Sequence, residues 1–197
     1  LDAARTGDRV IAVGDHGVIA ASIDQGHTWS RVPSPVGTGL TGISFSDTQE
    51  GWIVGHGGTI LHSSDTGNTW RTSDAGLEPG DSLLDVLALG RGRAVAIGAY
   101  GLIVETHDGG ATWRRLEPVS EDYHLNTLAL DRDGAWLLAG EAGLLARSSD
   151  ESASWEIFDT GYEGSFYGLL RLESGRLLAH GLRGHVFWSD DEGATWT

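Results

Sequence analysis

The sequence predicts an all-β protein, a β-propeller built from four-stranded antiparallel blades. Three observations predict this fold: a phrase that recurs five times, apolar runs of strand length, and turn residues between those runs. The phrase is Gly-x-x-Gly, a short apolar run, then Ser/Thr-x-Asp-x-Gly-x-Thr-Trp. It recurs about every 42 residues, and a period of that length is typical of propeller blades. The residues that close the five copies are Trp29, Trp70, Trp113, Trp155 and Trp196.

Each repeat contains four short segments that we expect to be strands. They are rich in Val, Ile, Leu and Trp, too short for helices, and bounded by turn residues. The first strand of a repeat is expected at residues 1–6, 40–45, 83–89, 125–130 and 166–172. The second and third strands flank the Gly-x-x-Gly turn, and the fourth begins at the tryptophan. The repeats are then residues 1–39, 40–82, 83–124, 125–165 and 166–197, in one propeller domain or a fragment of one.

The ends of the chain bear on the number of blades. Trp196 and Thr197 are only the start of a fourth strand, so the last blade lacks its outer strand within this sequence. The chain begins at Leu1 and contains no Met, which we interpret as a processed or trimmed piece of a longer protein. Because an open propeller leaves apolar faces uncovered, either five blades close on themselves or the piece belongs to a larger ring. We favour the larger ring.

Composition narrows the possible partners. The formal net charge is −15, with 28 acidic residues against 13 basic ones, and such a surface repels phosphate backbones. We therefore expect no nucleic acid partner. The chain has no Cys, so it has no disulfide framework and no thiolate chemistry, and no apolar run is long enough to span a membrane.

The repeated acidic turn has a structural explanation for every residue. In Ser63-Ser64-Asp65-Thr66-Gly67-Asn68-Thr69-Trp70 the Asp is expected to accept backbone N–H groups two and three residues on. Gly permits a positive φ, the hydroxyls tie the turn together, and the Trp covers it. Five metal or catalytic sites are the alternative, but a fold needs identical turns whereas an active site needs one unique set. We assign a structural role to all five aspartates: Asp24, Asp65, Asp108, Asp150 and Asp191.

One copy of the turn departs from the pattern. The fourth repeat has Ser152 where the others have Gly. We expect a strained or differently shaped turn there.

These turns are identified as Asp boxes, which occur in sialidases, other glycoside hydrolases, sorting receptors and the photosystem II assembly and stability factor family. Residues 51–61, Gly-Trp-Ile-Val-Gly-His-Gly-Gly-Thr-Ile-Leu, resemble the characteristic phrase of the last family, and the similarity covers essentially the whole chain. The resemblance implies an exported, seven-bladed, non-enzymatic propeller that assists assembly of a membrane protein complex. The chain also resembles relatives of this family in non-photosynthetic bacteria, some of which are associated with envelope transporters.

That resemblance sets our functional prediction. We predict a non-enzymatic scaffold that binds another protein, exported to the periplasm or, in a photosynthetic cell, the thylakoid lumen. No cofactor and no metal are expected. One departure concerns charge: family members are described as presenting a basic patch, whereas this acidic chain shows no Arg cluster beyond Arg91/Arg93 and Arg114/Arg115.

Two alternative functions stay open. One is a periplasmic accessory of an envelope transporter. The other is a sialidase-like glycoside hydrolase or glycan-binding propeller, in which a Tyr–Glu pair and an Asp would act. The sequence offers Tyr100, Tyr123, Tyr162 and Tyr167, with Glu105, Glu121 and Glu163 nearby. Arg31-Val32-Pro33 only partly matches the Arg-Ile-Pro phrase of sialidases, and we interpret it as coincidental.

The Gly-x-x-Gly turns are the expected recognition surface. Strand alternation places them on one face with the linkers between blades, and the Asp boxes on the opposite face. Their inserted residues vary on a constant framework, as in recognition surfaces. The side chains expected around the mouth of the central channel are His16, His56, Tyr100, Glu141 and Arg183.

Three further predictions concern neighbouring side chains. His16 and His56 could bind a metal, although solvated turn histidines are the simpler interpretation. The linkers add acids that could recruit a basic partner or bind Ca²⁺ weakly, or could be ordinary solvated loops: Asp74, Glu78, Asp81, Glu117, Glu121, Asp122, Asp159 and Glu163. The strand tryptophans are expected in the core between blades: Trp52, Trp136 and Trp188.

Overall fold

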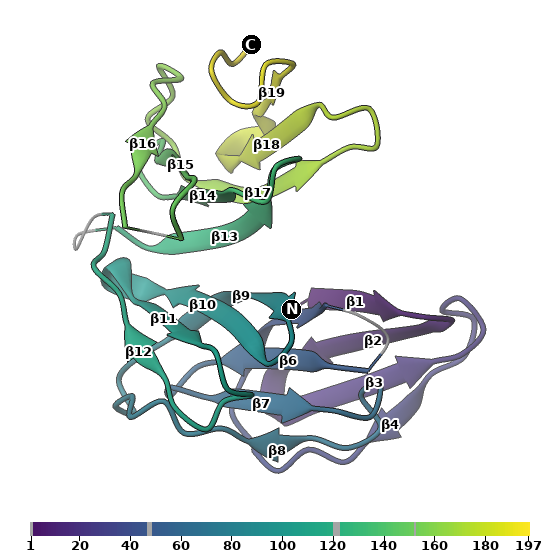
Figure 1. Ribbon diagram of the computed structural model, residues 1–197. Coiled ribbons are helices and arrows are strands. Elements are labelled where there is room, and N and C mark those ends of the chain that lie inside the picture. The colour runs from purple at the N-terminus through teal and green to yellow at the C-terminus, as the bar shows by residue number, and fades with distance from the viewer. Residues whose placement is uncertain (1, 47–48, 120–122, 152) are drawn as a thin grey trace. The chain divides into compact units, whose positions relative to one another are not determined.

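The computed structural model describes residues 2–46, 49–119, 123–151 and 153–197 (Figure 1). By its internal contacts the chain divides into two compact units. The first consists of Leu1–Gly98 with Ile103–Arg115, and the second of Ala99–Leu102 with Leu116–Thr197. In the part of the chain that is described, no helix is long and apolar enough to cross a membrane.

The first unit contains three four-stranded sheets, each with neighbouring strands antiparallel. The first sheet is β1 (Asp2–Thr6), β2 (Arg9–Gly14), β3 (Val18–Ser22) and β4 (Ser30–Val32). The second is β5 (Leu40–Phe45), β6 (Gly51–Gly55), β7 (Ile60–Ser63) and β8 (Arg71–Thr72). The third is β9 (Leu83–Gly90), β10 (Arg93–Gly98), β11 (Ile103–Thr106) and β12 (Arg114–Arg115).

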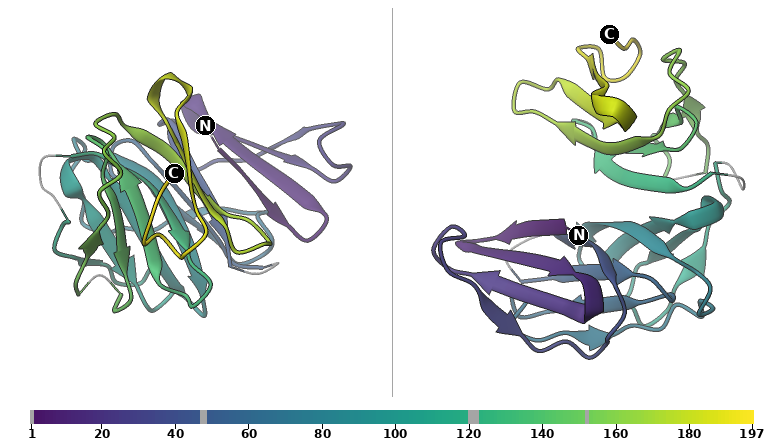
Figure 2. Two further views of the ribbon diagram at one scale, coloured as in Figure 1. Left: turned by 90° about the horizontal axis from the view of Figure 1, so that it is seen from above. Right: turned by 180° about the vertical axis from the view of Figure 1, so that it is seen from behind.

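The second unit contains two sheets in the same strand order. One is β13 (Leu125–Leu130), β14 (Trp136–Gly140), β15 (Leu145–Ser148) and β16 (Glu156–Ile157). The other is β17 (Phe166–Arg171), β18 (Leu177–Gly181) and β19 (Val186–Ser189), and Thr197 exchanges both backbone bonds with Trp188, at 3.0 Å each. Figure 2 shows the strands of each sheet as successive antiparallel ribbons. The prediction of repeated four-stranded antiparallel units is confirmed.

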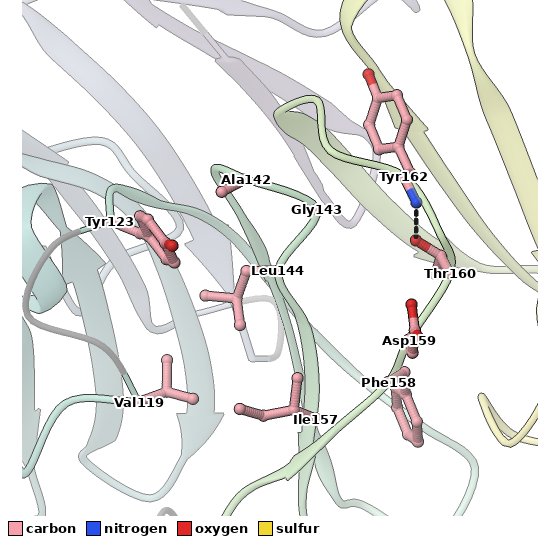
Figure 3. Close-up of a pocket in the computed structure, with 10 residues that line it drawn as sticks. All are labelled: Val119, Tyr123, Ala142, Gly143, Leu144, Ile157, Phe158, Asp159, Thr160 and Tyr162. Carbon is pink, nitrogen blue, oxygen red and sulfur yellow. Dashed lines mark hydrogen bonds between the residues drawn. The ribbon is translucent and has the colours of Figure 1, made fainter.

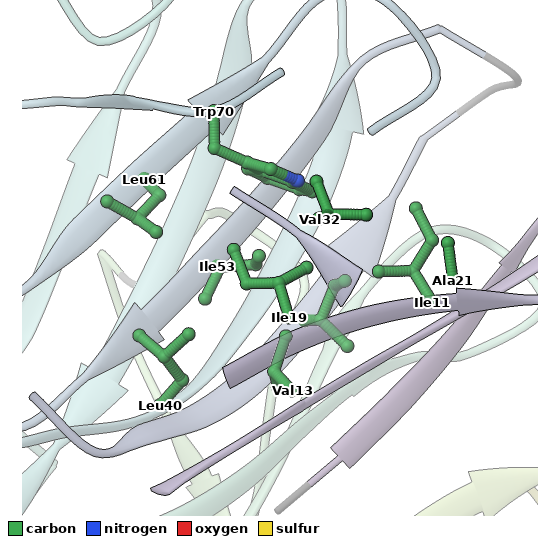
Figure 4. Close-up of a cluster of buried hydrophobic side chains, with 10 residues drawn as sticks. Ile11, Val13, Ile19, Ala21, Val32, Leu40, Ile53, Leu61 and Trp70 are labelled. Carbon is green, nitrogen blue, oxygen red and sulfur yellow. The ribbon is translucent and has the colours of Figure 1, made fainter. Parts of the chain in front are cut away.

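The core of the first unit lies between its successive sheets. Alternating side chains of β2 and β3, among them Ile11 and Ile19, pack against Leu40 and Ile53 of the second sheet (Figure 4). Trp70, which closes the second Asp box, is 8% exposed and joins this cluster. Trp113 likewise packs on the preceding sheet, where its ring meets Trp52 edge-on at 5.5 Å, whereas Trp29, in the first sheet, is 46% exposed.

The core of the second unit repeats this arrangement with Phe166 at its centre. Phe166 is fully buried among Leu137, Leu145 and Leu169. The strand tryptophans Trp52 and Trp136 are 0% and 2% exposed, as predicted.

The prediction for Trp188 is wrong. It is 39% exposed, with the Arg176 guanidinium 6.0 Å from its ring. Trp188 occupies the position before the Asp-box Ser, which holds a polar side chain in the three repeats before it, His62, Glu105 and Arg147, and Ala21 in the first.

Candidate functional site

The Asp box is held together by its side chains. In the first copy, Thr28 donates its N–H to Asp24 Oδ1 at 2.8 Å and its hydroxyl to Oδ2 at 2.6 Å. Ser22 donates its hydroxyl to Asp24 Oδ1 at 2.7 Å and accepts the Gly26 N–H at 2.8 Å. The main backbone donor thus lies four residues beyond the Asp, which corrects the expectation of two and three. In the second copy the Asn68 N–H, three residues on, adds a bond of 3.0 Å to Asp65.

These bonds shift the acidity of the aspartates. The Thr28 hydroxyl and N–H, with the Ser22 hydroxyl, lower the pKa of Asp24 to about 2. The equivalent bonds from Thr112 lower the pKa of Asp108 to about 2 as well. For Asp65, burial alone would raise the pKa, but the bonds from Thr69 and Ser63 outweigh it and the pKa is lowered. The carboxylates are therefore engaged by their own turns, as structural side chains are.

The fourth Asp box matches the others where it is described. Asp150 accepts the Ser154 N–H at 2.9 Å, the Ser154 hydroxyl at 2.6 Å and the Ser148 hydroxyl at 2.8 Å. Ser152, on which the expectation of a strained turn rested, lies outside the described residues.

The Gly-x-x-Gly turns are two-residue hairpin loops of type I′. Tyr100 has φ 53° and ψ 46°, Gly101 has φ 71°, and the Leu102 N–H donates to the Ala99 carbonyl at 3.2 Å. The same left-handed pair recurs at His16-Gly17 and Arg183-Gly184. In the other two repeats the left-handed pairs are Gly57-Gly58 and Ala142-Gly143. His56 and Glu141 therefore occupy the position before the left-handed residue, whereas His16, Tyr100 and Arg183 occupy the left-handed position itself.

Backbone bonds hold these turns against neighbouring linkers. In the first four repeats the N–H of the closing glycine donates to the linker before the next repeat, as Gly143 does to the Gly164 carbonyl at 2.8 Å. In the second, fourth and fifth repeats the residue after the opening glycine donates to the linker that precedes its own repeat, as Glu141 does to the His124 carbonyl at 3.1 Å. A Cβ on Gly143 would collide with the Tyr162 carbonyl oxygen, and one on Gly98 with the Ser82 carbonyl oxygen. Both glycines of the motif are thus required by close backbone approach.

This arrangement leaves four of the five predicted binding side chains exposed, and Glu141 partly buried. In the first unit, His16 and His56 are exposed, and the His56 ring lies 3.2 Å from the Ser82 hydroxyl. In the second unit, Tyr100 is 70% exposed and Arg183 is exposed. The five side chains belong to two separate units, so their arrangement as one ring around a channel stays a prediction.

Two of these residues, Glu141 and Tyr100, form a local cluster around His124 in the second unit. Glu141 Oε2 accepts the His124 N–H at 2.9 Å and lies 2.8 Å from His124 Nδ1. The Tyr100 ring lies against the same histidine with centroids 4.9 Å apart. The backbone bond from His124, stronger than the opposing effect of burial, lowers the pKa of Glu141, so the carboxylate stays charged.

The second unit also gathers arginines that the sequence analysis missed. Arg132, Arg171 and Arg176 line a pocket of about 130 Å³ on the face that carries the Asp boxes. Arg176 is held by Asp190 through bonds of 2.7 and 2.8 Å. The side chains of Arg132 and Arg171 have no hydrogen-bond or ion-pair partner among the described residues. The expectation of no Arg cluster beyond Arg91/Arg93 and Arg114/Arg115 is therefore wrong. These arginines flank the same hairpin in two successive repeats, and aligning the repeats would have revealed them.

Two of the residues weighed for an enzyme are engaged within the fold. Glu105 is 4% exposed and bound by Arg114 and His107. The Tyr162 hydroxyl donates to the Leu182 carbonyl at 3.0 Å. Glu121 and Asp122 lie outside the described residues. Within the described ranges, no three His, Asp or Glu side chains gather as metal ligands would.

Comparison with known proteins shows which family the chain resembles. The family model described as Photosynthesis system II assembly factor YCF48 matches residues 6–96 and 76–197. A photosystem II assembly lipoprotein Ycf48 from Synechococcus sp. (strain CC9902) is 35% identical over 107 residues, which are 51% of this chain and 31% of that protein. The Ycf48 lipoprotein of Trichormus variabilis is 26% identical over 84% of this chain and 50% of its own length. The chain thus spans half or less of these relatives.

A solved structure of YCF48 bound to D1 peptide has the same fold. It superposes with a TM-score of 0.74 at 22% identity, covering 100% of this chain and 70% of that one. Since the family model covers nearly the whole sequence, the chain belongs to the YCF48 family of photosystem II assembly factors.

Proposed function

We propose that this chain is the binding part of a non-enzymatic assembly factor, which holds a protein of a membrane complex on its Gly-x-x-Gly face. One observation carries the proposal. The turns on this face share one backbone conformation, held mainly by backbone bonds, yet present unlike side chains to solvent at corresponding positions. Constant scaffold with variable exposed side chains is the arrangement of a recognition surface.

Family membership supports the kind of function. The family model is that of an assembly factor, and one structural neighbour is a YCF48 bound to a peptide. We propose a protein partner for this chain too, and a location outside the cytoplasm, in the periplasm or the thylakoid lumen. The names of the relatives, a lipoprotein and a chloroplast protein, agree with that location.

The test is recovery of the partner from the native envelope. The full-length protein is immobilised, and bound membrane complexes are identified by mass spectrometry with and without Tyr100→Asn and Arg183→Asn. We expect one membrane complex, recovered less by the double variant. Equal recovery by both proteins, or retention on a glycan array with no protein recovered, would contradict the proposal.

A further inference from the structure

A second feature of the Gly-x-x-Gly face lies between the end of the third repeat and the fourth repeat, wholly within the second unit. It is a pocket of about 470 Å³ between the linkers on either side of the β13–β16 sheet. Figure 3 shows Val119, Tyr123, Leu144 and Ile157 directed toward a shared space, with Phe158 and Asp159 on the linker that follows β16. A pocket of this size admits a small ligand or a pair of side chains.

Ile157 makes this repeat different from the others. Two residues after the closing tryptophan the other repeats have Arg31, Thr72 and Arg115, and all three are exposed. The fourth repeat has Ile157 there, which is 62% exposed. A large apolar side chain replaces polar ones at a solvent-facing position, so repeat architecture does not account for it. Tyr123, 39% exposed, adds a second open apolar surface to the same pocket.

The walls of the pocket are held in place. The turn at Gly143 is bound to the Gly164 carbonyl, and the Tyr162 ring is fixed by its hydroxyl bond to Leu182 and by contact with Phe166, centroids 4.9 Å apart. Asp159 Oδ1 accepts the Gly161 N–H at 2.9 Å. The site is therefore preorganised, and binding costs little ordering of the protein.

Charge at the pocket selects the kind of occupant. Of the described residues that line it, none is basic, and Asp159 places a carboxylate at the wall. Glu117 and Glu163, both exposed, lie within two residues of the lining positions Val119 and Tyr162. The chain as a whole carries a net charge of −15. An apolar group flanked by positive charge complements such a surface.

We infer that this pocket binds an apolar side chain carried by a basic segment of the partner protein, with Ile157 and Tyr123 contacting the side chain and Asp159 pairing with a flanking Lys or Arg. The inference rests on the proposed function and adds to it the site and the chemistry of the bound segment. Aromatic and aliphatic anchors in pockets dominate the affinity of such contacts.

The experiment uses labelled peptides as probes and fluorescence anisotropy as readout. The probe is Arg-Lys-Leu-Phe-Lys-Arg, and the controls are Arg-Lys-Ala-Ala-Lys-Arg and Glu-Glu-Leu-Phe-Glu-Glu. We expect the probe to bind with a Kd about tenfold below that of either control. Ile157→Thr, which restores the residue type of the second repeat, is expected to weaken probe binding about tenfold. Thr72→Ile, the reverse change in the second repeat, is the matched control and should leave the Kd unchanged.

The electrostatic part has its own variant. Asp159→Asn should weaken the probe about threefold in low salt and make its Kd less dependent on salt concentration. Unchanged thermal denaturation of each variant shows that the fold is intact.

Three results would overturn the inference. They are equal affinity for the three peptides, no effect of Ile157→Thr, or displacement of the probe by a neutral xyloglucan oligosaccharide. If the envelope pull-down recovers a membrane complex while the probe does not bind, the pocket assignment is wrong and the proposed function stands. If the probe binds but no complex is recovered, the proposed function fails instead.

Discussion

The turns at the two opposite ends of the strands, the Asp boxes at one end and the Gly-x-x-Gly turns at the other, are stabilised by different kinds of bonds. In the Asp boxes, side chains make most of the bonds, so Asp and Ser/Thr recur in every copy and Gly in four of the five. In the Gly-x-x-Gly turns, backbone groups make most of the bonds, so only the glycines recur. The comparison separates residues that a fold must repeat from residues that it leaves free. On the first face, repetition of an acid indicates structure, and on the second face, variation of an exposed side chain indicates recognition.

The largest expected effect comes from adding a methyl group to a closing glycine. Gly17 has φ 67°, and a Cβ there would collide with the Val36 carbonyl oxygen. We expect Gly17→Ala to lower the free energy of unfolding of the first unit by about 3 kcal/mol, from overlap and left-handed strain together. His16→Ala, at the neighbouring exposed position, is the control and should change it by less than about 0.5 kcal/mol. Urea denaturation measures both, and equal effects would contradict the claim that backbone alone fixes this turn.

A smaller loss is expected on the opposite face when a box loses its carboxylate. Asp65 accepts bonds from the Ser63 hydroxyl, the Asn68 N–H and the N–H and hydroxyl of Thr69. Asp65→Ala leaves these donors to water and should cost about 2 kcal/mol of stability in the same urea experiment. Asp8→Ala, an exposed acid in a hairpin of the same unit, should cost less than about 0.5 kcal/mol. If both variants have the same free energy of unfolding as the parent, the Asp box does not have the structural role assigned to it.

A gain of stability is expected at a strained turn. Tyr100→Asn keeps the left-handed conformation with a residue that adopts it readily, so the protein should become more stable by about 1 kcal/mol. The same variant should recover less of the partner complex. Opposite signs of the two effects distinguish a recognition side chain from a structural one. Loss of stability in thermal denaturation would show that Tyr100 supports the fold.

The smallest expected effect is a dependence of the protein's stability on pH, and it is limited to acidic pH. The folded-state pKa of Asp24 and of Asp108 is about 2, below the value of about 3.9 for an unfolded Asp. The stabilisation from these carboxylates is therefore complete above about pH 5 and is lost as the pH falls through about 4 toward 2. Asp24→Asn should flatten the decline of the melting temperature over that range, compared with Asp8→Asn. A decline of the same steepness in both variants would contradict the pKa assignment.

Much of the fold follows from local signals in the sequence. Residues 40–45 and 125–130 are bounded by turn residues, and their predicted strands match β5 and β13 at both ends. The fourth strand is shorter than the pattern suggests because pairing begins after the tryptophan, whose ring packs on a sheet rather than extending one. The donor four residues beyond the Asp could not be predicted, since it depends on the left-handed residues Gln25 and Gly26 that bend the turn.

Less of the site could be predicted, because its parts come from different repeats. The glycines and the exposed turn residues such as Tyr100 and Arg183 are visible in the periodic pattern. The pocket beside Ile157 joins segments of neighbouring repeats, which packing brings together. Arg132 and Arg171 also come from neighbouring repeats, and their shared place becomes visible only when the repeats are aligned. Ile157 did leave one signal, an apolar residue where the aligned repeats have polar ones.

The central claim is that the Gly-x-x-Gly face, and not the Asp-box face, recognises the partner. The most direct test compares two double variants in the envelope pull-down with full-length protein. One is Tyr100→Asn with Arg183→Asn, and the other is Gln25→Asn with Glu192→Asn on the opposite face. All four positions are exposed and have φ between 53° and 62°, so the substitutions are matched in backbone strain. The account predicts that only the first pair loses the partner complex, whereas loss by the second pair with retention by the first would contradict it.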